Sequence, residues 1–264
     1  MLGKLIKNEF RSTFRYYWIF FVAFFGLSAA FGVINRVMTN NENVNPVFSI
    51  FAVLLAIIYI FGGFFMTLAP VIFSALRFNR SVLGNEGYLT NTLPVSTSKV
   101  VGAKLIIAIL WFVTTSVWSV ACSLFQSLIS TNFKETIKSF KQAYSFIFDK
   151  IEEEPMILVV ALLGLALASI SIILVEYASF SFSQIFNSYR GLKGSFIMIG
   201  ILIIKLIVFS IFAIVLVDDI LGKNASDTSI TYWIFGVMGV DSLIFGSVSY
   251  FITQWALKKH LNLQ

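Results

Sequence analysis

Six long stretches of the chain carry almost no charged side chains, and short polar segments separate them. The first lies between Arg15 and Arg36 and holds 20 uncharged residues; the second lies between Glu42 and Arg77 and holds 34. A helix needs about 20 mostly apolar residues to cross a bilayer, whereas a barrel strand is shorter and alternates in polarity. The pattern therefore predicts six membrane-spanning helices, at about residues 17–38, 47–76, 105–130, 156–186, 196–217 and 231–257.

Composition agrees with this class. The 264 residues are 58% hydrophobic and only 12% charged, against about 25% charged residues in soluble domains. We therefore expect a single all-α domain over residues 1–264 that lies in the lipid bilayer. The basic residues are scattered beside apolar stretches, which indicates membrane topology and excludes nucleic acid as the expected partner.

The distribution of Lys and Arg predicts the orientation of the chain. The N-terminus, residues 77–104, residues 187–195 and the C-terminal tail together hold 12 basic residues, whereas the segments on the other side hold six. Because an excess of Lys and Arg marks the cytoplasmic side, both termini are expected in the cytoplasm. The first apolar run is long for the core of a signal peptide, so we expect an uncleaved anchor.

Residues 1–16 are predicted to form an amphipathic helix in the cytoplasmic interface, before the first span. The apolar face holds Leu2, Leu5, Ile6, Phe10, Phe14 and Tyr17, and the basic face holds Lys4, Lys7, Arg11 and Arg15. Glu9 lies near the edge of the apolar face. Either it reaches water or pairs with a neighbouring arginine, which we favour, or it contacts the 77–104 segment.

A second amphipathic helix is predicted on the outer side, between the third and fourth spans. Its apolar residues recur at intervals of four and three: Phe133, Ile137, Phe140, Tyr144, Ile147 and Ile151. This spacing places them on one helical face, and Pro155 sets the end of the helix. That face can lie on the outer leaflet, cover the ends of the spans, or pair with a second copy.

Residues 77–104 form the best-defined polar insert between two spans. Gly84 and Gly87 precede a stretch from Tyr88 to Leu93 that is predicted to be a short helix at the membrane surface, and Pro94 interrupts it. Ser96 is placed to cap the helix that follows. The alternative is an ordinary solvated loop.

The chain lacks the motifs of common enzymatic chemistry. It contains no GxxxxGK[ST] phosphate loop, no HExxH and no nucleophile elbow. Cys122 is the only cysteine and His260 the only histidine, which excludes an internal disulfide and a histidine-based metal cluster. We therefore expect no catalytic residues and no metal site in this chain.

Three ionisable residues, Glu176, Lys205 and Asp241, fall deep inside the predicted spans. Lys205 lies 12 residues beyond Lys193, or about 18 Å, near the middle of a hydrocarbon core about 30 Å thick. A charge at that depth costs about 2.5–3.5 kcal/mol, so each should face the protein interior or a wet cavity. We expect Lys205 to pair with Glu176 or with Asp241; such a pair either fixes helix packing or belongs to a translocation path.

The segment NEGYLTNTLPVS from Asn85 to Ser96, with the opening LIKNEF from Leu5 to Phe10, resembles the membrane subunit of type-2 ABC transporters, the ABC exporter permease family. Six spans with both termini inside also fit, so the resemblance covers nearly the whole chain. In that family, the segment between the second and third spans is a coupling helix that docks on a separate ATPase. The resemblance implies that the residues contacting the ATPase are Glu86, Gly87, Tyr88, Leu89, Thr90, Leu93 and Pro94.

The same resemblance implies a permease in a bacterial plasma membrane, acting as a homodimer or with a second permease chain. Its substrate would be hydrophobic or amphipathic, such as a peptide, lipid or drug. This chain would hold no cofactor, since the partner ATPase would bind ATP and Mg. Two alternatives stay open: an ion- or proton-coupled secondary transporter that uses the intramembrane charges, and a non-transporting membrane sensor or anchor.

Overall fold

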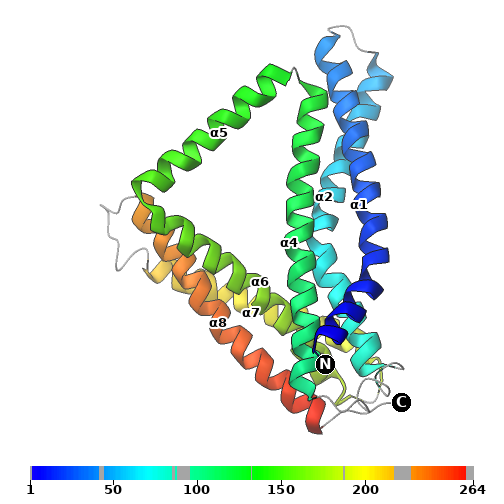
Figure 1. Ribbon diagram of the computed structural model, residues 1–264, viewed down its shortest axis with the longest axis vertical. Helices are drawn as coiled ribbons and strands as arrows, with labels where there is room; N and C mark the ends of the chain where they lie inside the picture. Colours follow the sequence, from blue (N-terminus) through cyan, green and yellow to red (C-terminus); the bar gives the residue numbers. More distant parts are fainter. Residues whose placement is uncertain are drawn as a thin grey trace. The chain divides into compact units, whose positions relative to one another are not determined.

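The computed structural model describes residues 2–41, 45–84, 87, 96–131, 133–186, 188–216 and 227–259, without the side chains at 143, 144, 146–151, 153, 216 and 227–229. This part of the chain contains seven α-helices and no strand (Figure 1). The helices are α1 (Leu2–Asn40), α2 (Pro46–Phe78), α4 (Thr97–Ser130), α5 (Phe133–Glu153), α6 (Pro155–Ser183), α7 (Arg190–Leu216) and α8 (Asp227–Lys259), and a π-helical turn, η1 (Asn79–Leu83), continues α2.

All of these helices except α5 are long and apolar enough to cross a membrane. The predicted all-helical class with six long apolar helices is therefore confirmed. A helix is the expected solution because hydrocarbon offers no hydrogen bonds, and a helix satisfies its backbone N–H and C=O groups internally. Pro155 is the first residue of α6, where the missing N–H of proline costs no helical hydrogen bond.

The helix ends differ in two places from the expected boundaries. α1 runs unbroken from Leu2 to Asn40, through the position where a separate interfacial helix was expected to end. The helical structure after α2 continues to Leu83, and α4 already begins at Thr97, directly after Ser96. The segment between these two helices is therefore shorter than the 77–104 insert that the polarity pattern predicts.

α5 occupies the region where the outer amphipathic helix was expected. Its first residues are tied to the end of α4, because the Thr136 hydroxyl donates to the Ser127 carbonyl at 3.1 Å. On the expected apolar face, Phe133, Ile137 and Phe140 are exposed, so the described part of the chain does not cover them. Tyr144, Ile147 and Ile151 lie outside the described side chains. Contact of this face with a bilayer or a second copy stays a prediction.

By their packing, the residues form two compact units. Unit 1 comprises residues 1–6, 71–109 and 151–264, and unit 2 comprises residues 7–70 and 110–150. The boundary within α2 follows Pro70, a proline inside the helix. Proline lacks the N–H of a normal helical hydrogen bond, which makes this a position of locally weaker helical structure.

In unit 2, aromatic side chains hold α1 against α4. The Trp111 ring stacks on Tyr17 with centroids 4.0 Å apart and planes 6° from parallel. The Trp111 Nε1–H donates to the Thr13 hydroxyl at 2.8 Å, and the Trp118 Nε1–H donates to the Phe21 carbonyl at 3.2 Å. Trp111 is buried and Trp118 half-buried, and each indole satisfies its only donor, as packed tryptophans usually do.

In unit 1, α6, α7 and α8 lie side by side, and α6 packs most extensively against α8 (Figure 1). Glycines permit this close approach. A Cβ atom added at Gly164 would lie 2.9 Å from the Phe235 carbonyl oxygen, and one at Gly246 would lie 3.6 Å from the Cα of Ser171. Small residues are common where membrane helices approach closely, because packing rather than water exclusion drives their association.

We predict that Gly164→Ala destabilises the α6–α8 packing, although alanine is the better helix former. The added methyl meets a backbone oxygen that cannot rotate away, and overpacking of this kind costs about 1–3 kcal/mol. Gly200→Ala on α7 is the matched control, because no atom lies within 4 Å of its added Cβ. It should be neutral or stabilising by up to about 1 kcal/mol. The measurement is the thermal unfolding midpoint in detergent, and equal midpoints for the two variants would contradict the packing.

Candidate functional site

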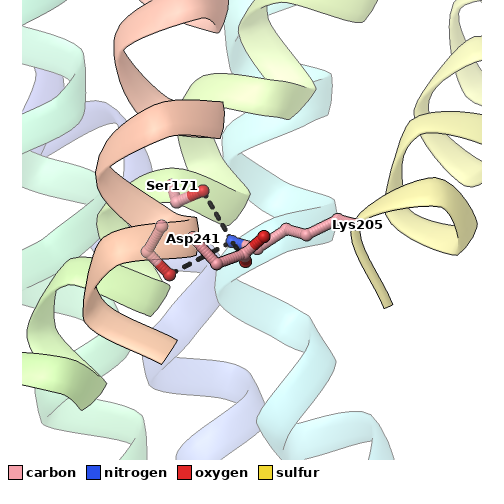
Figure 2. Close-up of polar contacts among 4 residues, drawn as sticks. Ser171, Lys205 and Asp241 are labelled. Atoms are coloured by element: carbon pink, nitrogen blue, oxygen red, sulfur yellow. Dashed lines mark hydrogen bonds and ion pairs between the residues drawn. The ribbon is translucent and has the colours of Figure 1, made fainter. Parts of the chain in front are cut away.

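Lys205 lies near the middle of α7, a helix whose apolar side chains are mostly exposed. Its ammonium group donates hydrogen bonds to the Ser171 hydroxyl of α6 at 2.7 Å and to the Ser242 hydroxyl of α8 at 3.3 Å. The same nitrogen lies 3.7 Å from Asp241 Oδ2, also on α8. Figure 2 shows Lys205 reaching from α7 toward Ser171 and Asp241. We call these four residues the intramembrane cluster.

The side chains of the cluster are mostly buried, and Lys205 is the most exposed of them. Ser171 and Ser242 are almost fully buried and Asp241 is 7% exposed. An isolated charge among apolar helices is costly, so the opposite charges and the two hydroxyls offset part of that cost. The compensation is incomplete at Asp241. Its Oδ2 is beyond hydrogen-bond distance from the lysine nitrogen, and its Oδ1 is buried without a hydrogen-bond partner.

Glu176 belongs to a different polar group. It is fully buried on α6, and the Ser74 hydroxyl of α2 lies 2.8 Å from each of its two carboxylate oxygens. Ser74 can donate only one hydrogen at a time, because a hydroxyl carries one O–H. Of the two acids that the sequence left open as partners of Lys205, Asp241 is the one beside it. The three predicted intramembrane residues thus fall into two groups.

Two grooves in unit 1 adjoin the intramembrane cluster. The larger, of about 400 Å³, lies between α7 and α8 and is lined almost wholly by apolar side chains, with Asp241 among them. The smaller, of about 340 Å³, lies among α6, α7 and α8, and both Lys205 and Asp241 line it. Volumes of this size match small-molecule sites, which are mostly apolar and hold a few polar groups that fix orientation.

A second feature of unit 1 is an apolar cluster at the helix ends that flank the candidate coupling segment. We call it the basal core. Phe78 stacks on Tyr177 within it, with ring centroids 4.2 Å apart. Its residues come from α2, η1, α4, α6 and α8: Phe78, Val82, Leu83, Val100, Val101, Ala108, Ile173, Tyr177, Phe180 and Leu257. The helix ends on both sides of residues 84–96 are therefore packed into one body.

Most of the predicted coupling residues lie outside the described part of the chain: Glu86, Tyr88, Leu89, Thr90, Leu93 and Pro94. Gly87 is described; it is buried, and its N–H donates to the Gly84 carbonyl at 2.8 Å. The expected short helix from Tyr88 to Leu93 and its contacts stay a prediction.

Lys104 has a different environment from the one its sequence position suggests. The polarity pattern places Lys104 at the end of the polar insert, but it lies on α4, is only 5% exposed and donates to the Ser81 hydroxyl of η1. The Ser81 hydroxyl in turn donates to the Arg77 carbonyl. Lys104 therefore links α4 to the π-helical turn that leads into the candidate coupling segment.

The N-terminal candidates all lie on α1. The four basic side chains of the predicted interfacial face, Lys4, Lys7, Arg11 and Arg15, are exposed, and Glu9 is half-buried. The Glu9 carbonyl accepts hydrogen bonds from the Ser12 and Thr13 hydroxyls at 2.8 and 2.9 Å. This pattern keeps the basic groups accessible to solvent or headgroups. The residues that pair with the intramembrane charges, Ser74, Ser171 and Ser242, were not identified from the sequence, since single serines in apolar helices carry no distinctive pattern.

Among the described residues, no group of three or more His, Cys, Asp or Glu side chains is arranged to hold a metal ion. The chain matches no family model, no curated protein and no solved structure.

We predict that Lys205→Met destabilises the protein because it leaves Asp241 as an unpaired buried charge. Removing one partner of a buried ion pair costs about 3–5 kcal/mol. The double variant Lys205→Met/Asp241→Asn should recover most of the loss, whereas Lys205→Met/Glu176→Gln should not, because Glu176 contacts Ser74. Yield and thermal unfolding midpoint in detergent report the result. Recovery by the Glu176 variant instead would refute the assigned pairing.

Proposed function

We propose that this chain is the membrane permease subunit of an ABC exporter and that a separate ATPase docks on the segment between α2 and α4. The basal core is the observation that carries the proposal. A docking segment can drive a permease only if its displacement reaches the spans, and the helix ends on both sides of this segment are packed against α6 and α8. The resemblance of residues 85–96 to the coupling segment of such permeases agrees with this role.

Polar contacts strengthen the connection between the segment and the helices. Lys104 binds Ser81 across the two helix ends, and the Thr97 hydroxyl donates to the Gln254 side-chain oxygen of α8 at 2.9 Å. The π-helical turn η1 lies directly before the segment. Such turns are rare and occur frequently at functional sites.

In the proposed arrangement, both termini lie in the cytoplasm of a bacterial cell, and residues 2–16 of α1 lie along the inner interface. α5 lies on the outer side, with Phe133, Ile137 and Phe140 against lipid or a second copy. The exposed apolar side chains of α2 and α7 suit contact with lipid or with a second permease chain. The exported substrate would be hydrophobic or amphipathic, and the ATPase would bind ATP and Mg.

A second candidate, an ion- or proton-coupled secondary transporter, is favoured by the intramembrane cluster and by Glu176. Ionisable side chains inside membrane helices commonly mark ion pathways and proton relays. Here Lys205 and Asp241 already offset each other's charge, and Glu176 is hydrogen-bonded to Ser74. These contacts also explain the residues as packing elements, so we place this candidate second.

We predict that Tyr88→Ala with Leu89→Ala abolishes association with the ATPase while membrane insertion is retained. Aromatic and apolar anchors dominate such contacts, and truncation of one costs about 2 kcal/mol or more. The matched control is Tyr189→Ala with Leu192→Ala, the same residue types on another segment expected in the cytoplasm, where they are 76% and 61% exposed. Co-purification and stimulated ATP hydrolysis are measured. Normal association of the first variant would reject the coupling assignment.

The source of energy separates the two candidates. For an ABC exporter, substrate accumulation in inverted vesicles that contain both subunits should require ATP and persist when a protonophore collapses the proton gradient. A secondary transporter should show the opposite dependence, and Asp241→Asn with Lys205→Met should then uncouple transport from the gradient. Absence of transport under both conditions, with ATPase binding intact, would favour a sensor or anchor.

A further inference from the structure

We propose that the α7–α8 groove binds an uncharged amphiphile, with its apolar body along the groove and a hydroxyl or amide N–H donated to Asp241 Oδ1. This molecule would be the substrate class of the proposed exporter. Only its role as a substrate rests on the proposed function; its binding in the groove does not. It depends on two independent features, the apolar groove and an unsatisfied acceptor beside it.

The groove is suited to an apolar body. It is lined by aliphatic and aromatic side chains, including Val208, Phe212, Trp233, Val237 and Phe245. Its volume of about 400 Å³ lies in the range of small-molecule sites, which begins at about 300 Å³. Trp233 is partly exposed on this surface, so a molecule in the groove would touch an intrinsic fluorophore.

Asp241 supplies the polar end of the site. The side chain lines the groove and is 7% exposed, yet its Oδ1 has no hydrogen-bond partner and its Oδ2 has only the ammonium of Lys205 at 3.7 Å. A buried acceptor without a donor costs about 1–3 kcal/mol. The terminal torsion of aspartate is soft, so a rotation of the carboxylate can turn Oδ1 toward the groove.

Charge balance decides the class of head group. Lys205 and Asp241 together carry no net charge, and the Lys205 nitrogen is already hydrogen-bonded to Ser171 and Ser242. An ammonium head would place a second positive charge beside Lys205 and leave one buried charge uncompensated. A carboxylate head would be repelled by the negative charge of Asp241. A neutral donor satisfies Oδ1 without either penalty.

The test uses the intact protein in lipid nanodiscs and a set of probes with one chain and different heads. Bromododecanol, bromododecane and bromododecylammonium are compared at equal mole fraction in the lipid, and bromine quenches tryptophan fluorescence on contact. The Trp233 signal is the difference between each protein and its Trp233→Phe counterpart. We expect the alcohol to bind at least about tenfold more tightly than the alkane, the effect of one net hydrogen bond to a charged acceptor.

Two variants locate the site. Gly236 lines the groove, and a Cβ there has no atom within 4 Å, so the side chain of Gly236→Leu has room to start into the groove and should abolish the preference for the alcohol. Gly200→Leu, at an equally open position on α7 outside the groove lining, is the matched control and should leave the preference unchanged. Lys205→Met/Asp241→Leu, which removes the acceptor and both charges, should bind alcohol and alkane equally.

Equal quenching by alcohol and alkane in the unmodified protein would overturn the proposal and identify the groove as a binding site for lipid acyl chains. Stronger quenching by the ammonium probe would overturn the uncharged class. Unaltered preference in Gly236→Leu would place the binding elsewhere. The measurement needs no ATPase, so its failure leaves the proposed docking untouched, and failure of ATPase docking leaves this site untouched.

Discussion

The bilayer core offers no hydrogen bonds, and Lys205 shows what this constraint does to the packing. α7 is apolar along most of its length, and its described apolar side chains are exposed or half-buried, so apolar contacts alone hold it only loosely in rotation. The ammonium group must nevertheless find polar partners, and it finds them on two other helices: Ser171 of α6, and Ser242 and Asp241 of α8. The polar contacts of Lys205 can form in only one register, so this side chain fixes both the rotation and the height of α7 against α6 and α8. Contacts between apolar surfaces have no comparable preference for one register.

Serine plays two roles in these helices, and the difference follows from the same constraint. Ser179 and Ser183 donate to the carbonyls of Val175 and Phe180 in their own helix, which satisfies a hydroxyl at almost no cost. The Ser74 hydroxyl lies 3.1 Å from the Val71 carbonyl of its own helix but closer, at 2.8 Å, to the Glu176 carboxylate, and Ser171 accepts from Lys205. An ionisable group among apolar helices therefore forms a hydrogen bond with a nearby hydroxyl of another helix. This bond fixes the register of the two helices at that height.

The spans could be predicted from the sequence because bilayer thickness is a one-dimensional constraint, and a count of uncharged residues measures it directly. The depth of Lys205 and Asp241 followed in the same way. A residue count could not show whether Asp241 or Glu176 is the partner of Lys205. That choice depends on the rotation of α6 against α8, which close contacts at Gly164 and Gly246 set. The same limit applies to Lys104. Counting residues along the sequence places this lysine at a helix end, but only the packing shows that its side chain turns inward to Ser81.

The basal core and the intramembrane cluster share α6 and α8, and this sharing gives the proposed transport cycle a physical route. On α6, Tyr177 of the basal core and Ser171 of the cluster are separated by six residues, or about 9 Å. On α8, Leu257 and Asp241 are separated by 16 residues, about 24 Å along a continuous helix.

In the proposed mechanism, a displacement of the coupling segment tilts the packed ends of α6 and α8. Lys205 lies on α7, which contacts α8 much less than α6 does. In this proposal the contact between Lys205 and Asp241 Oδ2 is lost first, since at 3.7 Å it is longer than the hydrogen bonds of Lys205 to Ser171 and Ser242. Loss of this contact would leave the Asp241 carboxylate free to rotate and to turn Oδ1 toward a substrate in the α7–α8 groove. ATP-driven motion and substrate affinity would then be coupled through one carboxylate.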